Sequence, residues 1–239
     1  MADPCRIRRT QGDPDHRAAA VGGHNEGMHL DHLSFAVGPA GLKTTASELS
    51  EKFGAAFLAG GVHPRFGTNN MILPLQNRQY LELVEALEHP ASEKAPFGQA
   101  VKARSELGGG WLGWCVSVED IEPVEHRIGR HSVPGNRHRP DGYNLNWQQI
   151  GVHGMRTDPQ LPYVLKWDVP AEEHPSQMAE SDVTLVALEI AGSPERLADW
   201  LGEPAVSALE QIEVRWVAPN GAPGILAAEF ETPTGIVRL

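Results

Sequence analysis

A recurring order of predicted elements constrains this fold more than any other feature of the sequence. Between residues 30 and 84 the pattern predicts a strand, a helix and three further strands, and a similar order begins again at Trp111 and at Val183. Alternating apolar and polar residues mark the strands, and apolar residues three or four apart mark the helices. Because repeated units bury their apolar faces against their neighbours, we predict an α+β fold of βαβββ modules that form curved mixed sheets with helices on the outer faces.

The modules also set the expected domain boundaries. Residues 1–27 have no hydrophobic periodicity and are interpreted as a disordered tail, with Met28 as an alternative start. Two clear modules, 28–90 and 108–169, are predicted to form one domain that extends to residue 176. The remainder, 177–239, is predicted to form a third, divergent βαβββ-like module.

Composition narrows the function class. The formal net charge is -11 and the pI is near 5.4, so the surface repels phosphate backbones and argues against a nucleic-acid partner. No apolar run approaches the roughly 20 residues that span a bilayer, and the polar start lacks the apolar region of a signal peptide. Cys5 and Cys115 are the only cysteines, which argues against a disulfide framework. We therefore expect a cytoplasmic protein with a small-molecule partner.

Three segments together resemble a known superfamily. Residues 32–37 (HLSFAV) resemble the opening strand of a vicinal-oxygen-chelate module, and residues 80–84 (YLELV) resemble its closing strand. Between them, residues 63–70 (HPRFGTNN) resemble the HP-x-x-GT-x-N segment of the glyoxalase-like domain subgroup. The resemblance covers about residues 29–176 well and residues 183–239 weakly, and its strength lies in the order of the motifs.

The resemblance implies a cup-shaped pocket with a metal. In this superfamily, which includes glyoxalases, bleomycin-resistance proteins and dioxygenases, paired modules bind a divalent metal that chelates vicinal substrate oxygens. The ligands are typically a His or Gln on the first strand and a Glu on the last strand of a module. His32 and Glu82 stand at these positions. The resemblance therefore implies a zinc, iron, manganese or nickel site at His32 and Glu82, and the absence of a metal stays an open alternative.

Strand alternation agrees with a pocket position for both side chains. His32 lies on the face opposite Leu33 and Phe35, and Glu82 lies on the face opposite Leu81 and Leu83. If the apolar faces pack on the helix, the two polar side chains point into the cup. A buried carboxylate is costly unless it is paired, hydrogen-bonded or metal-bound.

The second module departs from the metal pattern. Alignment of the modules places Gly113 opposite His32 and Lys166 opposite Glu82, so the second His/Glu pair is missing. A catalytic metal usually has three protein ligands, and the third could be His63, Glu229 or Glu231. Alternatively, Lys166 neutralises Glu82 and takes the electrostatic place of a cation; Lys166 is thus also a predicted substrate-binding residue.

The segment between the second and third strands supplies further candidates. His63 precedes a proline in a predicted loop, where it could act as a general base, a ligand or an anion contact. Arg65 is the predicted contact for a substrate carboxylate. Asn70 could hydrogen-bond a substrate oxygen or simply cap a turn.

These features support more than one function. The first hypothesis is a small-molecule enzyme of the lyase, isomerase or dioxygenase type, with His32, His63 and Glu82 as catalytic residues. The second is a non-catalytic protein of the bleomycin-resistance type that binds or sequesters a small molecule. A third is an interaction module whose cup is filled with side chains. Because related modules pair within a chain or between chains, a homodimer stays open.

Overall fold

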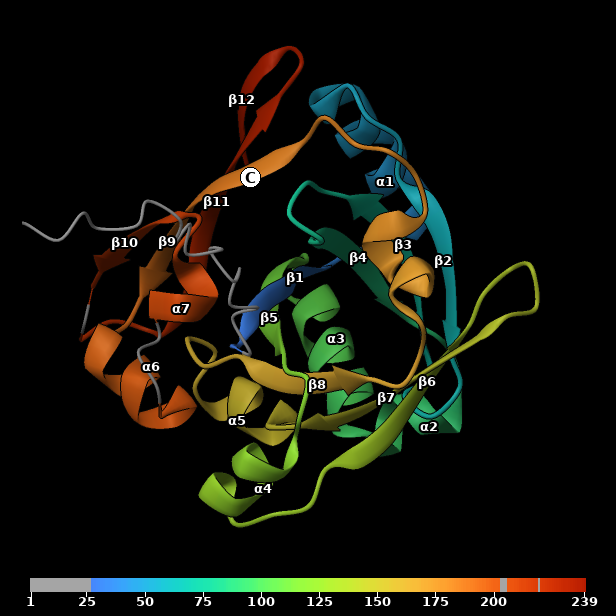
Figure 1. Ribbon diagram of the computed structural model, residues 1–239. Helices are drawn as coiled ribbons and strands as arrows, with labels where there is room; N and C mark the ends of the chain where they lie inside the picture. The colour runs from blue at the N-terminus through green and yellow to red at the C-terminus, as the bar shows by residue number, and fades with distance from the viewer. Residues whose placement is uncertain (1–26, 203–205, 219) are drawn as a thin grey trace, which may run out of the picture.

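Eight strands close into one barrel, and a separate four-stranded sheet lies beside it (Figure 1). The computed structural model describes residues 27–202, 206–218 and 220–239, so residues 1–26 of the predicted tail lie outside the described residues. The strand order around the barrel is β1-β4-β3-β2-β6-β7-β8-β5. The predicted α+β class with curved sheets is confirmed, and the two cups are joined into a single barrel.

The first module contains the predicted strand, helix and three strands. Its elements are β1 (His29–Ala36), α1 (Leu42–Phe53), β2 (Leu58–His63), β3 (Thr68–Pro74) and β4 (Tyr80–Ala86). The helix ends as predicted at Gly54, whose φ of 62° lies in the left-handed region that favours glycine. The first strand pairs in parallel with the last, and Ser34 lies opposite Glu82 in this register. This pairing brings the two predicted ligand strands side by side.

The second module completes the barrel. Its elements are β5 (Gly110–Ser117), α4 (Glu122–Ile128), β6 (Val133–His138), β7 (Asn144–Ile150), α5 (Val152–Thr157) and β8 (Tyr163–Trp167). One seam between the modules is the long antiparallel pairing of β1 with β5. The other seam is short, since β2 meets β6 only where Val62 lies opposite His138.

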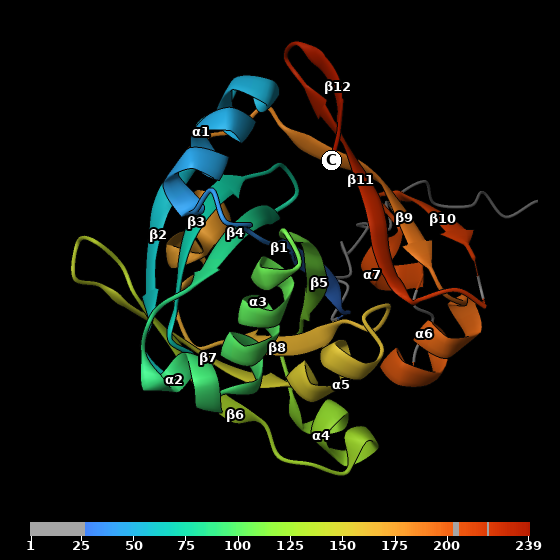
Figure 2. The ribbon, with the colours of Figure 1, turned by 180° about the vertical axis from the view of Figure 1, so that it is seen from behind.

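Helices and apolar side chains fill both sides of the barrel wall. Two further helices, α2 (Pro90–Lys94) and α3 (Pro96–Glu106), connect the modules. Phe97 and Val101 of α3 join an apolar cluster inside the barrel, whereas Leu33 and Trp114 belong to a second cluster outside it. Figure 2 shows α3 from the far side, in front of β1, β4 and β5. No helix among the described residues is long and apolar enough to cross a membrane.

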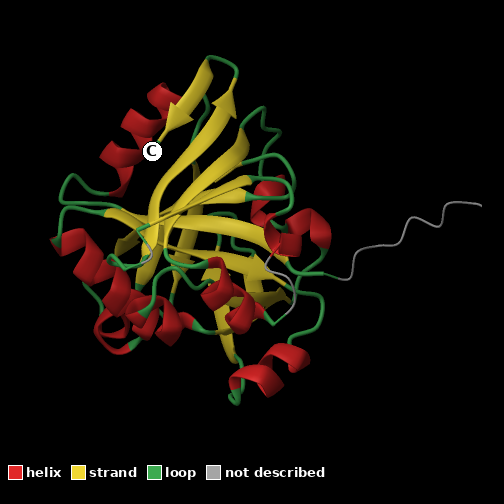
Figure 3. Ribbon diagram, turned by 90° about the vertical axis from the view of Figure 1, so that its left-hand side faces the viewer, coloured by secondary structure: helices red, strands yellow, loops and turns green. Residues whose placement is uncertain are grey.

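The C-terminal unit repeats the chain order of a module but not its strand pairing. Its elements are β9 (Thr184–Ala191), α6 (Pro194–Leu201), α7 (Val206–Leu209), β10 (Glu213–Val217), β11 (Gly224–Thr232) and β12 (Gly235–Arg238). The sheet order is β10-β9-β11-β12, so the first strand pairs in parallel with the second strand rather than with the last. Figure 3 turns the molecule so that the side that carries β9 and β10 in Figure 1 faces the viewer. Phe230 packs edge-on against Phe53 of α1 at 5.1 Å between ring centroids, which fixes the unit to the first module.

Two local predictions differ from the structure. The segment 61–70, predicted as a loop, is a hairpin in which β2 and β3 are joined by a turn at Gly67, where φ is 64°. Strand β6 was missed, because the sequence Val133-Pro134-Gly135 is typical of a turn. Gly135 is required there, since an added Cβ would lie 2.3 Å from the ring of Trp147. Both strands carry side chains into the barrel.

Candidate functional site

A small cavity lies inside the barrel, and we call it the inner cavity. Its volume is about 30 Å³, which holds about two water molecules at roughly 10–15 Å³ each. Every strand of the barrel except β5 contributes to the wall, and two residues, Phe66 and Phe97, come from a turn and from α3. The lining residues are His32, His63, Phe66, Asn70, Tyr80, Glu82, Phe97, Arg137, Trp147, Gln149, Tyr163, Leu165 and Trp167.

A buried carboxylate, Glu82 of β4, stands in the cavity wall. Ser34 Oγ donates a hydrogen bond to one carboxylate oxygen and Asn70 Nδ2 donates to the other, each at 2.7 Å. Burial by itself raises the pKa of Glu82, but the neighbouring His32 and His63 rings and these two hydrogen bonds bring that pKa below its usual range. The carboxylate is therefore ionised at neutral pH, and each oxygen keeps a lone pair for a further partner.

His63 at the end of β2 is a neutral imidazole beside this carboxylate. Its Nδ1 lies 2.8 Å from Thr68 Oγ1, and its Nε2 lies 3.4 Å from Asn70 Nδ2. Because the Asn70 amide donates to Glu82, its nitrogen also faces His63, so the network assigns the ring proton to Nδ1. Burial lowers the pKa of His63 from 6.5 to about 4, with Glu82 opposing the shift and Arg137 adding to it.

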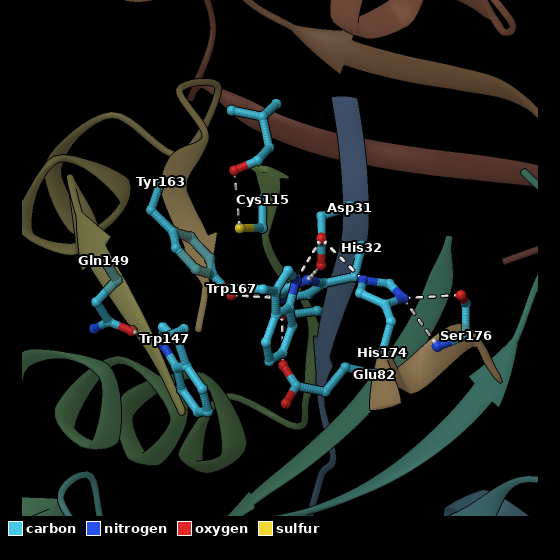
Figure 4. A network of polar contacts seen from close by, with 12 residues as sticks. Asp31, His32, Glu82, Cys115, Trp147, Gln149, Tyr163, Trp167, His174 and Ser176 are labelled. Atoms are coloured by element: carbon cyan, nitrogen blue, oxygen red, sulfur yellow. Dashed lines mark hydrogen bonds and ion pairs between the residues drawn. The ribbon is translucent and has the colours of Figure 1, made fainter. Parts of the chain in front are cut away.

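A second network orients His32 of β1 (Figure 4). Asp31 accepts a hydrogen bond from Nδ1 at 2.6 Å, so Nε2 is left to face the Tyr163 hydroxyl at 2.5 Å. The ring also stacks on Tyr80, with 4.4 Å between centroids. Burial raises the pKa of Tyr163 well above 10, which keeps its hydroxyl protonated. The imidazole of His32 and the protonated phenol of Tyr163 therefore lie together at one side of the inner cavity.

Asp31 is the centre of this second network. Its other oxygen accepts from Trp167 Nε1 at 2.9 Å and lies 3.2 Å from His174 Nε2, as the dashed lines in Figure 4 indicate. Burial by itself raises the pKa of Asp31, but its contacts with His174 and His32 hold that pKa well below its usual range. His174 comes from the segment 170–181, whose Pro, Glu, Ser and His content is typical of a linker. That segment contains two short 3-10 turns, Ala171–Glu173 and Pro175–Gln177, and it anchors the network.

Among the residues that the structure describes, Arg137 of β6 is the only arginine or lysine in the wall of the inner cavity, and no salt bridge joins it to a carboxylate. Its side chain is 2% exposed, and two of its nitrogens, Nε and Nη2, are buried without a hydrogen-bond partner. Burial lowers the pKa of Arg137 from its usual value, although Tyr80 and Glu82 oppose the shift. An arginine keeps its proton in proteins, so the wall holds a cation. Among the described residues, no salt bridge joins Arg137 to Glu82.

The structure brings four of the predicted site residues together and leaves two elsewhere. His32, His63, Asn70 and Glu82 all line the inner cavity. Arg65 is exposed in the turn between β2 and β3 and does not line the cavity.

The hypothesis that Lys166 neutralises Glu82 is wrong. Lys166 lies outside the cavity wall, where its amine bonds Asp168 at 2.7 Å. The reason is register: Cys115 lies opposite Tyr163 as Ser34 lies opposite Glu82, so Tyr163 is the true counterpart of Glu82 in the second module.

The side chains present do not fit a divalent metal in this arrangement. Both nitrogens of His32 already have partners, and no three His, Cys, Asp or Glu residues among those described are grouped to hold an ion. The second ligand pair is absent, and the space beside Gly113, the counterpart of His32, is occupied by Met155, whose Sδ would lie 2.6 Å from an added Cβ. Arg137 also places a positive charge in the same wall. The metal at His32 and Glu82 stays a prediction, and no reaction step is derived through it.

Sequence reasoning missed Arg137, Asp31 and Tyr163. Arg137 cannot be found by strand alternation, because the Val133-Pro134-Gly135 sequence of its strand, β6, is typical of a turn. Asp31 gives no signal in the sequence, because the register between β1 and β5 shifts between Leu30 and His32 and its partners Trp167 and His174 are distant along the chain. Tyr163 could have been found from the repeat itself, had the closing strand been aligned three residues earlier.

Comparisons with known proteins agree with this barrel. A hypothetical protein from Staphylococcus aureus has a similar structure, with a TM-score of 0.56, 16% identity and coverage of 72% of this chain and 75% of that chain. Methylmalonyl-CoA epimerase from Mycobacterium tuberculosis is less similar, with a TM-score of 0.40, 14% identity and coverage of 59% and 89%. A search of curated proteins found no match. The family model described as "Glyoxalase-like domain" matches residues 30–205, so this chain belongs to the glyoxalase-like domain family.

Proposed function

We propose that this protein is a small-molecule enzyme that transfers a proton on an anionic substrate inside the barrel. Membership of the glyoxalase-like family supports a small-molecule enzyme or binding function. The observation that carries the finer proposal is one pair of residues. An ionised carboxylate, Glu82, and an unpaired guanidinium, Arg137, line the same cavity without bonding each other.

Arg137 is the proposed contact for the substrate's negative charge. An unpaired buried cation costs several kcal/mol, and a hydrogen bond between ionised groups is about twice as strong as a neutral one. An anion that enters the barrel is therefore attracted by the positive charge of Arg137 and accepts hydrogen bonds from its two free nitrogens. A neutral ligand would leave that cost in place.

Glu82 is the proposed base. Its carboxylate accepts a proton from a carbon beside a substrate carbonyl, and the electron pair of the broken C–H bond moves onto the carbonyl oxygen. Return of the proton to the opposite face or to another atom gives an isomer, so no oxidant or reductant is required. Ser34 and Asn70 hold the carboxylate in one orientation, and such positioning is what makes proton transfer efficient.

His32 and Tyr163 are proposed to serve the oxygen that gains charge. The phenol is protonated and its hydroxyl lies against the imidazole, whose far nitrogen is bound by Asp31. The Tyr163 hydroxyl has one proton and faces His32 Nε2 in the free protein, so the proposed step turns that proton from the imidazole to the carbonyl oxygen as negative charge develops there. Neutral His63 lies beside the Asn70 amide that donates to Glu82, so its proposed role is to support that amide.

The proposal is tested with 2-oxo acids in deuterated water. The probes are 2-oxobutanoate and 2-oxooctanoate, and the measurement is deuterium incorporation at C3 by proton NMR. We expect exchange above the buffer rate for the wild type and a rate lower by about 10²-fold or more for Glu82→Gln. Arg137→Gln is expected to raise KM more than it lowers kcat. Exchange that is unchanged in Glu82→Gln would overturn the role of that residue.

A non-catalytic binding protein is the second candidate, favoured by the absence of the second His/Glu pair and by the two hydrogen bonds that already occupy Glu82. The same probes distinguish the two. Binding that depends on Arg137, with no exchange above buffer, would support sequestration and exclude proton transfer on these substrates.

A further inference from the structure

A second and much larger cavity adjoins the inner one, and we call it the outer groove. Its volume is about 910 Å³, and it lies between the second module and α6 of the C-terminal unit. Phe66, Phe97 and Gln149 line both spaces, so these three side chains form the partition between them. The two aromatic rings pack edge to face, 5.9 Å apart.

The volumes of the two spaces restrict the ligand. The inner cavity, at about 30 Å³, has room for about two waters and for no whole organic molecule. The outer groove is within the range of about 300–1,000 Å³ that is usual for small-molecule sites. A ligand that reaches Arg137 therefore places a small head in the barrel and leaves its body in the groove.

The charged side chains of the inner cavity favour a ligand whose head group is a carboxylate. The free nitrogens of Arg137, Nε and Nη2, share one edge of the planar guanidinium, and their spacing matches the two oxygens of a carboxylate. A single cation faces the cavity together with the negative charge of Glu82. That balance favours a monoanion over a doubly charged phosphate, which the Glu82 carboxylate would repel.

The outer groove favours an apolar body. Its exposed lining is mainly apolar, and Arg196, one of its charged residues, is bound to Asp158. The apolar side chains come from α4, β6, α5, the turn before β8 and α6, and they include Ile128, Val133, Val152, Leu161 and Trp200. Transfer of each methylene from water to such a surface changes affinity by about threefold to fourfold.

We infer that the ligand is an amphipathic monocarboxylate, with its head on Arg137 in the inner cavity and its apolar body in the outer groove. This inference rests on the proposed function, because it uses the same Arg137 contact, and it adds the substrate class. Phe66 and Phe97 must separate for the ligand to pass. The gap between the two rings therefore selects ligands whose head group is narrow.

The test is a chain-length series. Acetate, butanoate, hexanoate and octanoate are titrated against the full chain, with binding followed by tryptophan fluorescence and by calorimetry, and 1-octanol serves as the uncharged probe. We expect affinity to rise about threefold per methylene, octanol to bind at least tenfold more weakly than octanoate, and Arg137→Gln to weaken every acid. Arg78→Gln, at an exposed arginine outside both cavities, is the matched control and should change nothing.

A pair of valine variants tests the groove separately. Val133→Asp places a carboxylate in the groove at a side chain that is 53% exposed, and Val62→Asp makes the same change at a 39% exposed position outside both cavities. We expect Val133→Asp to weaken octanoate at least tenfold and to leave acetate unchanged, with no effect of Val62→Asp. Acids that bind through Arg137 with equal affinity at all lengths, or octanoate binding that Val133→Asp leaves intact, would overturn the groove inference alone. Acids that fail to bind, or that bind Arg137→Gln equally well, would overturn the proposed anion site as well.

Discussion

Substitution of Arg137 by methionine is expected to make the unliganded protein more stable. The guanidinium is 2% exposed, and two of its nitrogens are buried without a partner. Each unsatisfied buried donor costs about 1–3 kcal/mol, and the lost attraction to Glu82 offsets part of the gain. We expect a net increase of about 2 kcal/mol in the free energy of unfolding, since methionine fills a similar unbranched shape. For a chain of this size that corresponds to a rise of about 4–8 °C in Tm.

Urea denaturation and thermal melts at pH 7.5 would measure the change. Arg65→Met, at an exposed arginine outside the inner cavity, is the control and should shift Tm by no more than about 2 °C. A loss of stability of about 1 kcal/mol or more for Arg137→Met would refute the reasoning, because it would mean that the cation has a structural partner. A gain in stability together with loss of ligand binding would be the signature of a residue kept for function at a cost to the fold.

Three further changes follow from the same geometry. The folded pKa of His63 is lowered to about 4 from 6.5, so the unfolded chain binds the extra proton first as pH falls. Stability should therefore drop by about 3 kcal/mol between pH 6.5 and pH 4 through this group, a drop that urea titrations should find missing in His63→Gln. Gly60→Ala would place a Cβ 2.1 Å from Asn70 Oδ1, so we expect about 1–3 kcal/mol of destabilisation and a loss of activity; Gly154→Ala, whose nearest atom would be 3.5 Å away, is the control. Lys166→Gln should change stability by less than about 1 kcal/mol and leave carboxylate affinity unaltered, and a large drop in affinity would restore its predicted role.

Much of the fold could be predicted because short-range sequence patterns determine the strands and helices of its modules. The alternation around Leu33 and the helix end at Gly54 depend only on neighbouring residues. Leu33 lies in an apolar cluster while His32 lines the cavity, and Gly54 ends α1 in the left-handed region. The closed barrel was not predicted, because closure depends on the seams between modules, and one seam is a single pair of residues.

The site was predicted in part for the same reason. His32, His63, Asn70 and Glu82 lie on strands whose inward faces follow from alternation or from the family motifs, and all four line the cavity. The sequence predicts that Lys166 supplies the positive charge near Glu82, whereas in the structure Arg137 supplies the positive charge in the cavity wall. A strand that begins Val-Pro-Gly carries a turn signature, and only tertiary pairing with β7 overrides it.

The proposed buried cavity and its cation are tested most directly by a crystal structure with a heavy-atom carboxylate. Crystals soaked in 2-bromooctanoate would locate the bromine by anomalous scattering and the carboxylate by its density. We expect the carboxylate on the Nε and Nη2 edge of Arg137, with the alkyl chain passing between Phe66 and Phe97 into the outer groove. Bromine that is bound elsewhere on the protein, with Arg137 left unpaired as it is now, would contradict the account.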